Sequence, residues 1–175
     1  MNVIFLDIDY VLNGESTTDH IGRIRGIDDE KVALLKELVD YSNAILVLSS
    51  SWKKYWSKDL INDGKSLRGN TTKRYGRYIN HKLAKYNLKI EDKVEDIYWR
   101  DRALEIRQWL ETHPEVKNFV ILDDVDFRWR RYGLDSHWVD TYEKDDIYWI
   151  EGLTPYHIEK AKNIFDKQTK LDTNQ

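Results

Sequence analysis

Three groups of oxygen-bearing side chains follow short apolar segments of this sequence, where they could do chemistry together. They are Asp7-Ile8-Asp9, Ser49-Ser50-Ser51 and Asp123-Asp124. Carboxylates gathered at one rim favour a bound cation, and oxygen ligands without His or Cys favour Mg²⁺. Hydroxyls beside the backbone N–H groups of a helix start can bind phosphate. The three groups therefore predict a Mg²⁺ site beside a phosphate site.

These groups can meet only if the segments before them are neighbouring parallel strands. Segments 3–6, 44–48 and 119–122 are continuously apolar, which is typical of strands covered on both faces. The carboxyl ends of such strands border the active crevice of an open α/β sheet. Because residues i and i+2 of a strand point the same way, Asp7 and Asp9 should enter that crevice together.

Amphipathic segments between the predicted strands complete the pattern. Helices are expected after a cap at Asp28 or Asp29, over 52–60, before Pro114, and from Thr154-Pro155 to about Phe165. Strands alternating with helices predict an α/β fold, with a doubly wound, mainly parallel sheet and helices on both faces. Residues 137–141 are expected to add a further strand.

The composition excludes several classes of protein and of site. The chain has 175 residues and a net charge of −3, and it contains no cysteine, which excludes disulfides, thiolate zinc sites and a cysteine nucleophile. We expect a single domain over 1–165, with 53–100 as a possible small insertion and 166–175 as a frayed polar tail. Acidic residues interrupt the apolar start of the chain, and no long apolar run follows, so a cytoplasmic protein without a membrane span is expected.

The ordered motifs resemble the haloacid dehalogenase (HAD) phosphohydrolase superfamily, and most closely the HAD domains of Swiss-army-knife RNA-repair proteins. The resemblance is carried by residues 5–13, 48–53, 105–116, 120–126 and 152–154, and it is loose between residues 59 and 100. It implies a Mg²⁺-dependent phosphatase with a Rossmannoid core and a minimal cap.

The resemblance also implies roles for single residues. Asp7 would be the nucleophile that forms an aspartyl-phosphate, and Asp9 the general acid and then the general base. Ser50 would hold the phosphoryl oxygens, with Ser49 as the competing assignment. Arg102 would take the place of the usual lysine of the third motif and bind phosphate, with Arg100 as the alternative.

The metal ligands implied by the resemblance follow the first and the third predicted strands. Asp7, Asp123 and Asp124 would bind Mg²⁺ together with the backbone carbonyl of Asp9. The sequence departs from the family's pattern at Tyr10, where glycine is usual. Tyrosine at this position is expected to distort the loop or to place an aromatic ring beside the substrate.

The spacing of the motifs leaves little room for a cap. The loop 13–27 is short, and 53–100 holds only a modest insertion, so we expect an open site for a phosphorylated nucleic-acid end or a nucleotide. Eight basic residues and no acidic one lie between positions 65 and 90, with tyrosines among them, a composition that suits single strands. The candidate substrate-binding residues are Lys73, Arg74, Tyr75, Arg77 and Tyr10. The alternative is an ordinary solvated helix face, balanced by the acidic residues that follow.

Three functions remain open at this point. The first is a phosphatase of polynucleotide 3′ or 5′ ends or of nucleotides. The second is a HAD phosphatase for a small metabolite or a phosphoprotein, and the third is a non-catalytic nucleotide-binding module with a HAD-like fold.

Overall fold

A parallel sheet forms the centre of the molecule. The computed structural model describes residues 1–60, 71–96, 101–144 and 149–172. Five strands are arranged in the order β5–β4–β1–β6–β7, and every neighbouring pair is parallel. The strands are β1 (Asn2–Leu6), β4 (Ile45–Leu48), β5 (Ile90–Lys93), β6 (Asn118–Asp123) and β7 (Trp138–Asp140). This confirms the predicted doubly wound α/β fold and the strand expected within 137–141.

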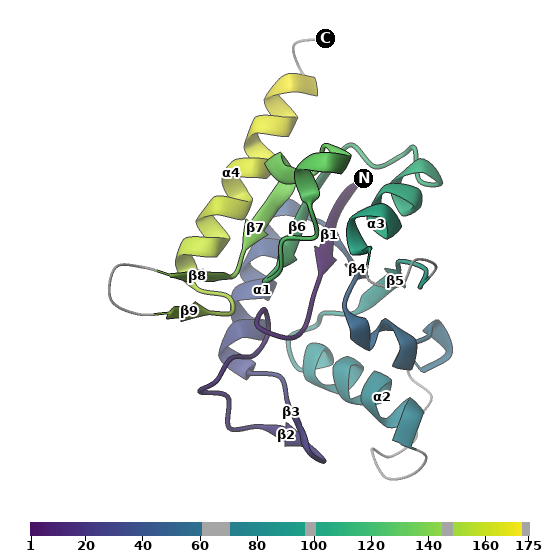
Figure 1. Ribbon diagram of the computed structural model, residues 1–175, viewed down its shortest axis with the longest axis vertical. Coiled ribbons are helices and arrows are strands. Elements are labelled where there is room, and N and C mark those ends of the chain that lie inside the picture. Colours follow the sequence, from purple (N-terminus) through teal and green to yellow (C-terminus); the bar gives the residue numbers. More distant parts are fainter. Residues whose placement is uncertain (61–70, 97–100, 145–148, 173–175) are drawn as a thin grey trace.

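Helices cover both faces of this sheet (Figure 1). They are α1 (Asp29–Ser42), α2 (Thr71–Ala84), α3 (Arg102–Glu111) and α4 (Pro155–Asp172). Strand alternation sends Ile4 and Leu6 into a cluster with α1, α2 and α4, and sends Val3 and Phe5 into a second cluster with α3. The two clusters explain why the strands are continuously apolar.

Local sequence signals fix where the helices begin. The carboxylate of Asp28 accepts a hydrogen bond from the backbone N–H of Glu30 at 2.9 Å, and that of Asp101 accepts one from Leu104 at 3.2 Å. Pro155 is the first residue of α4, where a missing N–H costs nothing. No helix in the described residues has the length and apolarity that a membrane span requires.

The segment after β4 differs from the predicted helix over 52–60. It forms two 3₁₀ helices, η1 (Ser51–Tyr55) and η2 (Lys58–Leu60), with extended backbone at Trp56 between them. The ammonium of Lys93 donates to the carbonyls of Lys53 and Trp56, both at 3.0 Å, and so takes up acceptors that a continuing α-helix would use. The helical spacing nevertheless predicted the burial of Trp52 and Trp56 correctly.

The C-terminal helix is longer than expected. We predicted a frayed tail from residue 166, but α4 continues to Asp172. The side chain of Gln168 explains part of the difference, because it accepts from the backbone N–H of Phe119 at 2.8 Å and donates to its carbonyl at 2.9 Å. These bonds connect the last turns of α4 to the start of β6.

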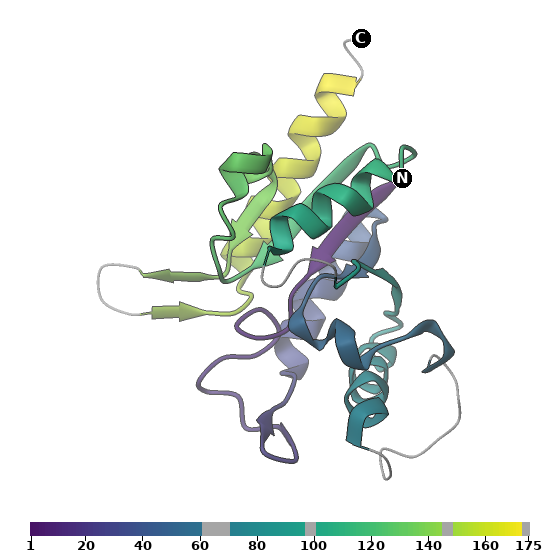
Figure 2. The same cartoon turned by 45° about the vertical axis from the view of Figure 1, so that its right-hand side comes forward.

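Two short hairpins were not predicted from the sequence. They are β2 (His20–Ile21) with β3 (Ile24–Arg25), and β8 (Tyr142–Lys144) with β9 (Trp149–Glu151). Strands of two or three residues are too short to show alternation. Figures 1 and 2 show the first hairpin and α2 at the end of the molecule toward which β1 points, with the second hairpin to one side.

Helix α2 packs closely against η1 because of Gly76. A Cβ atom at this position would lie 2.4 Å from the carbonyl oxygen of Tyr55 and 2.7 Å from the side chain of Leu60. The glycine therefore sets the distance between α2 and the segment that follows the Ser49-Ser50 pair.

We expect Gly76→Ala to destabilise the protein by about 1–3 kcal/mol, since the overpacking outweighs the roughly 1 kcal/mol gained in helix propensity. Urea denaturation would measure the change. Lys73→Ala on the exposed face of the same helix is the control and should stay within about 0.5 kcal/mol of the unsubstituted protein. A Gly76→Ala protein of raised stability would show that the close approach is not needed.

Candidate active site

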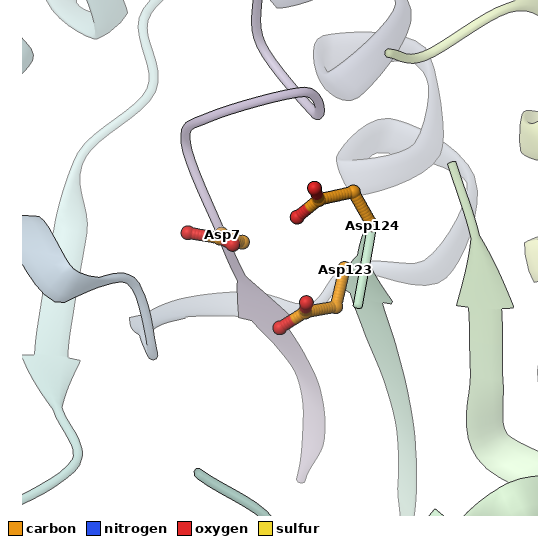
Figure 3. A group of neighbouring side chains, drawn as sticks. All are labelled: Asp7, Asp123 and Asp124. Carbon is orange, nitrogen blue, oxygen red and sulfur yellow. The ribbon is translucent and has the colours of Figure 1, made fainter. Parts of the chain in front are cut away.

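Three of the four carboxylates predicted to gather at the sheet edge do so. Asp7 follows β1, Asp123 ends the neighbouring β6, and Asp124 comes next. One carboxylate oxygen from each of the three lies within 4.8 Å of the others (Figure 3). Asp123 is fully buried and Asp7 is 4% exposed, whereas Asp124 is half-buried. Two strands that pair directly therefore bring together residues more than 100 positions apart.

Strand alternation explains which way these side chains point. Phe5, Val47 and Ile121 all belong to the cluster that faces α3. Asp123 is two residues beyond Ile121 in the same strand, and Asp7 continues the same alternation from Phe5. Both carboxylates therefore point to the α3 side of the sheet, where that helix begins.

Arg102, the first residue of α3, lies between the two buried carboxylates. Its Nη1 donates a hydrogen bond to Asp7 at 2.5 Å and another to Asp123, and its guanidinium lies 4.6 Å from the ring centre of Phe127. Burial lowers the pKa of Arg102, but the attraction of the two carboxylates outweighs it and leaves that pKa above its usual value. The guanidinium is thus a fixed positive charge.

One guanidinium does not balance three carboxylates. Burial raises the pKa of Asp123 well above its usual range, and the nearby charge of Asp7 raises it further. The same two causes raise the pKa of Asp124 to about 7. A site that is short of positive charge and offers only carboxylate oxygens fits a hard divalent cation.

The side chain of Asp9 lies outside this three-carboxylate group within the described residues. One of its oxygens accepts a hydrogen bond from Nε1 of Trp52 at 3.0 Å, and the other accepts one from Nδ2 of Asn13 at 3.3 Å. Both carboxylate oxygens are therefore held by side chains from other segments. The prediction that the side chains of Asp7 and Asp9 gather at one point is therefore wrong for Asp9, because Asp9 lies beyond β1, where strand alternation no longer applies.

The two serines differ in what their hydroxyls do. Ser50 is the N-cap of η1, and its Oγ accepts from the backbone N–H of Trp52 at 3.2 Å. Ser49 is fully buried, and its Oγ has no hydrogen-bond partner among the described residues. Ser49 follows Leu48, which pairs with Leu6 just before Asp7. Alternation from Val47 sends Ser49 to the same side of the sheet as Asp7 and Asp123.

Tyr10 adopts the left-handed conformation that explains why glycine is usual at this position. Its φ is 52°, and its ring lies 5.4 Å from that of Tyr142 and 5.6 Å from the guanidinium of Arg25. The phenol donates to Glu15 at 2.6 Å, and the backbone carbonyl accepts from Thr141 at 2.8 Å. The ring is thus held between the two hairpins, directly after Asp9.

The other predicted substrate-binding residues lie on α2. Lys73 is exposed and pairs with Asp59 at 3.5 Å, whereas the ring of Tyr75 packs 4.9 Å from Tyr55 and 5.8 Å from Trp52. Arg74 and Arg77 are half-buried. The alternative third-motif residue, Arg100, lies outside the described residues.

Sequence reasoning missed the residues that support the site. Trp52 and Asn13 hold Asp9, and Phe127 lies against Arg102. A buried ion pair also joins Lys53 in η1 to Glu105 in α3 at 2.8 Å. Asn13 and Trp52 lie within the segments that carry the family resemblance, and this position could have marked them as candidate site residues. Nothing in the sequence, however, indicates that they contact Asp9.

Comparison with known proteins gives one match. Residues 3–147 match the family model described as HAD domain in Swiss Army Knife RNA repair proteins. Searches of curated proteins and of solved structures returned no match. The matched range contains every one of the predicted site residues.

The contacts of Arg102 with two buried carboxylates predict that the protein loses stability when the guanidinium is removed. Arg102→Met should destabilise the protein by about 3 kcal/mol in metal-free urea denaturation, because it leaves two buried carboxylates without their counter-charge. Arg107→Met removes an exposed arginine 3.8 Å from Glu111 and should cost about 0.5 kcal/mol or less. Equal losses from the two substitutions would contradict the assigned role of Arg102.

Proposed function

The chain belongs to the family of HAD domains in Swiss Army Knife RNA repair proteins, and we propose that it is a Mg²⁺-dependent phosphomonoester hydrolase of nucleic-acid ends or nucleotides. The observation that carries this proposal is the group of three carboxylates at two adjacent strand ends, with one buried guanidinium against it. A bound Mg²⁺ would be held by Asp7, Asp123 and Asp124 and would offset the charge of the phosphoryl group.

The proposed chemistry uses the two aspartates of the first motif. A carboxylate oxygen of Asp7 attacks phosphorus, and the bond from phosphorus to the ester oxygen breaks as Asp9 gives that oxygen a proton. Asp9 then takes a proton from a water molecule that attacks the aspartyl-phosphate, which releases phosphate and restores Asp7. The hydrogen bonds from Trp52 and Asn13 support this role, because they fix the carboxylate of Asp9 in one orientation.

Arg102 and Ser49 are proposed to hold the phosphoryl oxygens. The guanidinium of Arg102 already contacts the nucleophile, so it can neutralise negative charge that develops there. We favour Ser49 over Ser50 for the hydroxyl contact, because the Oγ of Ser50 is engaged as a helix cap. This reverses the order in which the sequence ranked the two serines.

The substrate class rests on the family and on the short loops around the site. Loop 13–27 carries only a hairpin with strands of two residues each, which is too small to cover the site. An uncovered site suits a large substrate. Tyr10, directly after Asp9, is proposed to present its ring to the base next to the scissile phosphate. The proposal includes a cytoplasmic location, as expected from the sequence.

The first test is phosphate release from a 3′-phosphorylated oligonucleotide, a 5′-phosphorylated one and a mononucleotide. We expect Mg²⁺-dependent release that chelation abolishes and that Asp7→Asn reduces by at least about 10³-fold, since the nucleophile is removed. Asp135→Asn, an exposed aspartate of η4 (Asp135–His137), is the matched control and should retain activity.

Each outcome of this test has a distinct meaning. Release from an oligonucleotide supports end processing, and release from the mononucleotide alone would narrow the function to nucleotide hydrolysis. A folded protein that releases phosphate from neither, with any of Mg²⁺, Mn²⁺ or Co²⁺, would overturn the proposal.

A second prediction separates the two serines. Ser49→Ala should lower kcat/KM by about 10–100-fold, the usual effect of removing a hydrogen bond to a charged group. Ser50→Ala should mainly cost about 1 kcal/mol of stability, because it removes the cap of η1. Steady-state kinetics with thermal melting of both variants would measure the two effects, and a larger kinetic loss in Ser50→Ala would restore Ser50 as the phosphate ligand.

A further inference from the structure

A cavity of about 300 Å³ opens between loop 13–27 and helix α2, and the catalytic residues do not line it. It is lined by Asp19, His20 and Ile21 from the loop, and by Arg74, Tyr78, His81, Lys82 and Lys85 from the helix. Five of these eight side chains are Arg, Lys or His. The cavity is therefore a candidate site for an anion.

The wall between the loop and the helix is built by hydrogen bonds. The phenol oxygen of Tyr78 accepts from the backbone N–H of Ile27 at 2.7 Å and donates to Asp19 at 2.8 Å. Gly26 permits this approach, because a Cβ atom there would lie 2.4 Å from the phenol oxygen. The cavity is thus held open by fixed backbone and side-chain contacts, which lowers the cost of binding.

The positive charges of the cavity are only partly balanced. Lys82 lies 2.9 Å from Asp19 and 2.5 Å from Asp29, and Lys85 lies 3.4 Å from Asp29. Arg74 differs, since no carboxylate of the described residues lies within ion-pair distance of it. Its buried Nε also has no hydrogen-bond partner there. Among the described residues around the cavity, three permanent cations face two carboxylates, which leaves a net positive charge.

Loop 13–27 connects this cavity to the catalytic edge. The amide of Asn13 donates both to Asp9 at 3.3 Å and to the backbone carbonyl of Gly26 at 3.0 Å. The N–H of Gly26 in turn donates to the carbonyl of Asp19, a residue of the cavity wall, at 2.7 Å. Three consecutive hydrogen bonds therefore separate the proposed proton-transfer group from the cavity.

We propose that this cavity binds a second phosphate group of the substrate, one that the enzyme does not hydrolyse. The inference rests on the proposed function and specifies it, because it makes the substrate a molecule with at least two phosphates. Arg74 and Lys85 contact that phosphate, while Lys82 remains in its ion pairs and shapes the wall. Such a phosphate occurs as a phosphodiester of a polynucleotide strand or as the other phosphate of a nucleoside bisphosphate.

Binding measured without turnover tests the cavity separately from catalysis. The probes are a fluorescent single-stranded hexanucleotide without terminal phosphates, followed by anisotropy, and a nucleoside 3′,5′-bisphosphate used as competitor with Mg²⁺ removed. Arg74→Gln with Lys85→Gln should weaken binding of the probe that occupies the cavity by about tenfold. The salt dependence of hexanucleotide binding should also fall, by about 0.7 in the log–log slope for each phosphate that the variant no longer neutralises.

The control removes the same two charges elsewhere. Arg107 lies on the exposed face of α3, and Lys117 is exposed just before β6, at the sheet edge opposite the catalytic one. Arg107→Gln with Lys117→Gln should leave both affinities within about twofold of the unsubstituted protein. Thermal melts of both double variants establish that they are folded.

The outcomes separate the two sources of the phosphate. Weakened hexanucleotide binding assigns the cavity to a phosphodiester, and weakened competition by the bisphosphate alone assigns it to a nucleotide. Equal effects of the two double variants, or no effect of either, would overturn the cavity proposal. Because neither probe needs to be hydrolysed, this result stands whether or not the phosphatase test succeeds.

A kinetic measurement tests whether the cavity and the active site bind the same substrate molecule. The ratio of kcat/KM for a 3′-phosphorylated hexanucleotide to kcat/KM for a small aryl phosphate should fall about tenfold in Arg74→Gln with Lys85→Gln, if the phosphodiester is the occupant. An unchanged ratio despite weakened hexanucleotide binding would overturn the claim that the cavity and the catalytic edge hold one substrate.

Discussion

The contact of one guanidinium with two buried carboxylates is the interaction on which this site depends. Asp7 and Asp123 lie at the ends of paired strands, so the sheet register alone brings like charges together at low solvent exposure. Arg102 can reach both because α3 begins at this point, with Asp101 capping its first turn. A buried charge pair stabilises only when each partner is satisfied. Here one guanidinium already faces two carboxylates, and Asp124 adds a third. The fold thus produces a site that is short of positive charge.

The core of the fold was predictable because its signals are local. Continuous apolar segments mark strands covered on both faces, and Asp28 and Pro155 mark helix starts whatever the tertiary context. The segment after β4 was not predictable in the same way, since the contacts of Lys93 with two of its carbonyls come from a distant strand. The extension of α4 beyond Phe165 likewise depends on the bonds of Gln168 to β6.

The residues of the candidate site likewise fall into those with a local sequence signal and those whose contacts depend on the tertiary structure. The strand-end aspartates and Arg102 were found from spacing and family resemblance, and the geometry brings Asp7, Asp123 and Arg102 into contact. The sequence could not distinguish Ser49 from Ser50, because the hydrogen bond by which the Ser50 hydroxyl caps η1 depends on a 3₁₀ helix that the sequence did not predict. The sequence could not distinguish between the basic residues of segment 65–90. In the structure Lys82 is buried in ion pairs, whereas Arg74 has no carboxylate of the described residues beside it.

The left-handed backbone of Tyr10 has a consequence for how this site can diverge between relatives. A side chain at φ 52° costs about 1–2 kcal/mol, and this chain offsets that cost with contacts to Glu15, Arg25 and Tyr142. Glycine at the same position would remove the strain and the contacts together. In a relative with glycine, Arg25 and Tyr142 would lack the ring that they contact here, so substitutions at Tyr10, Arg25 and Tyr142 should be inherited as a set rather than one at a time.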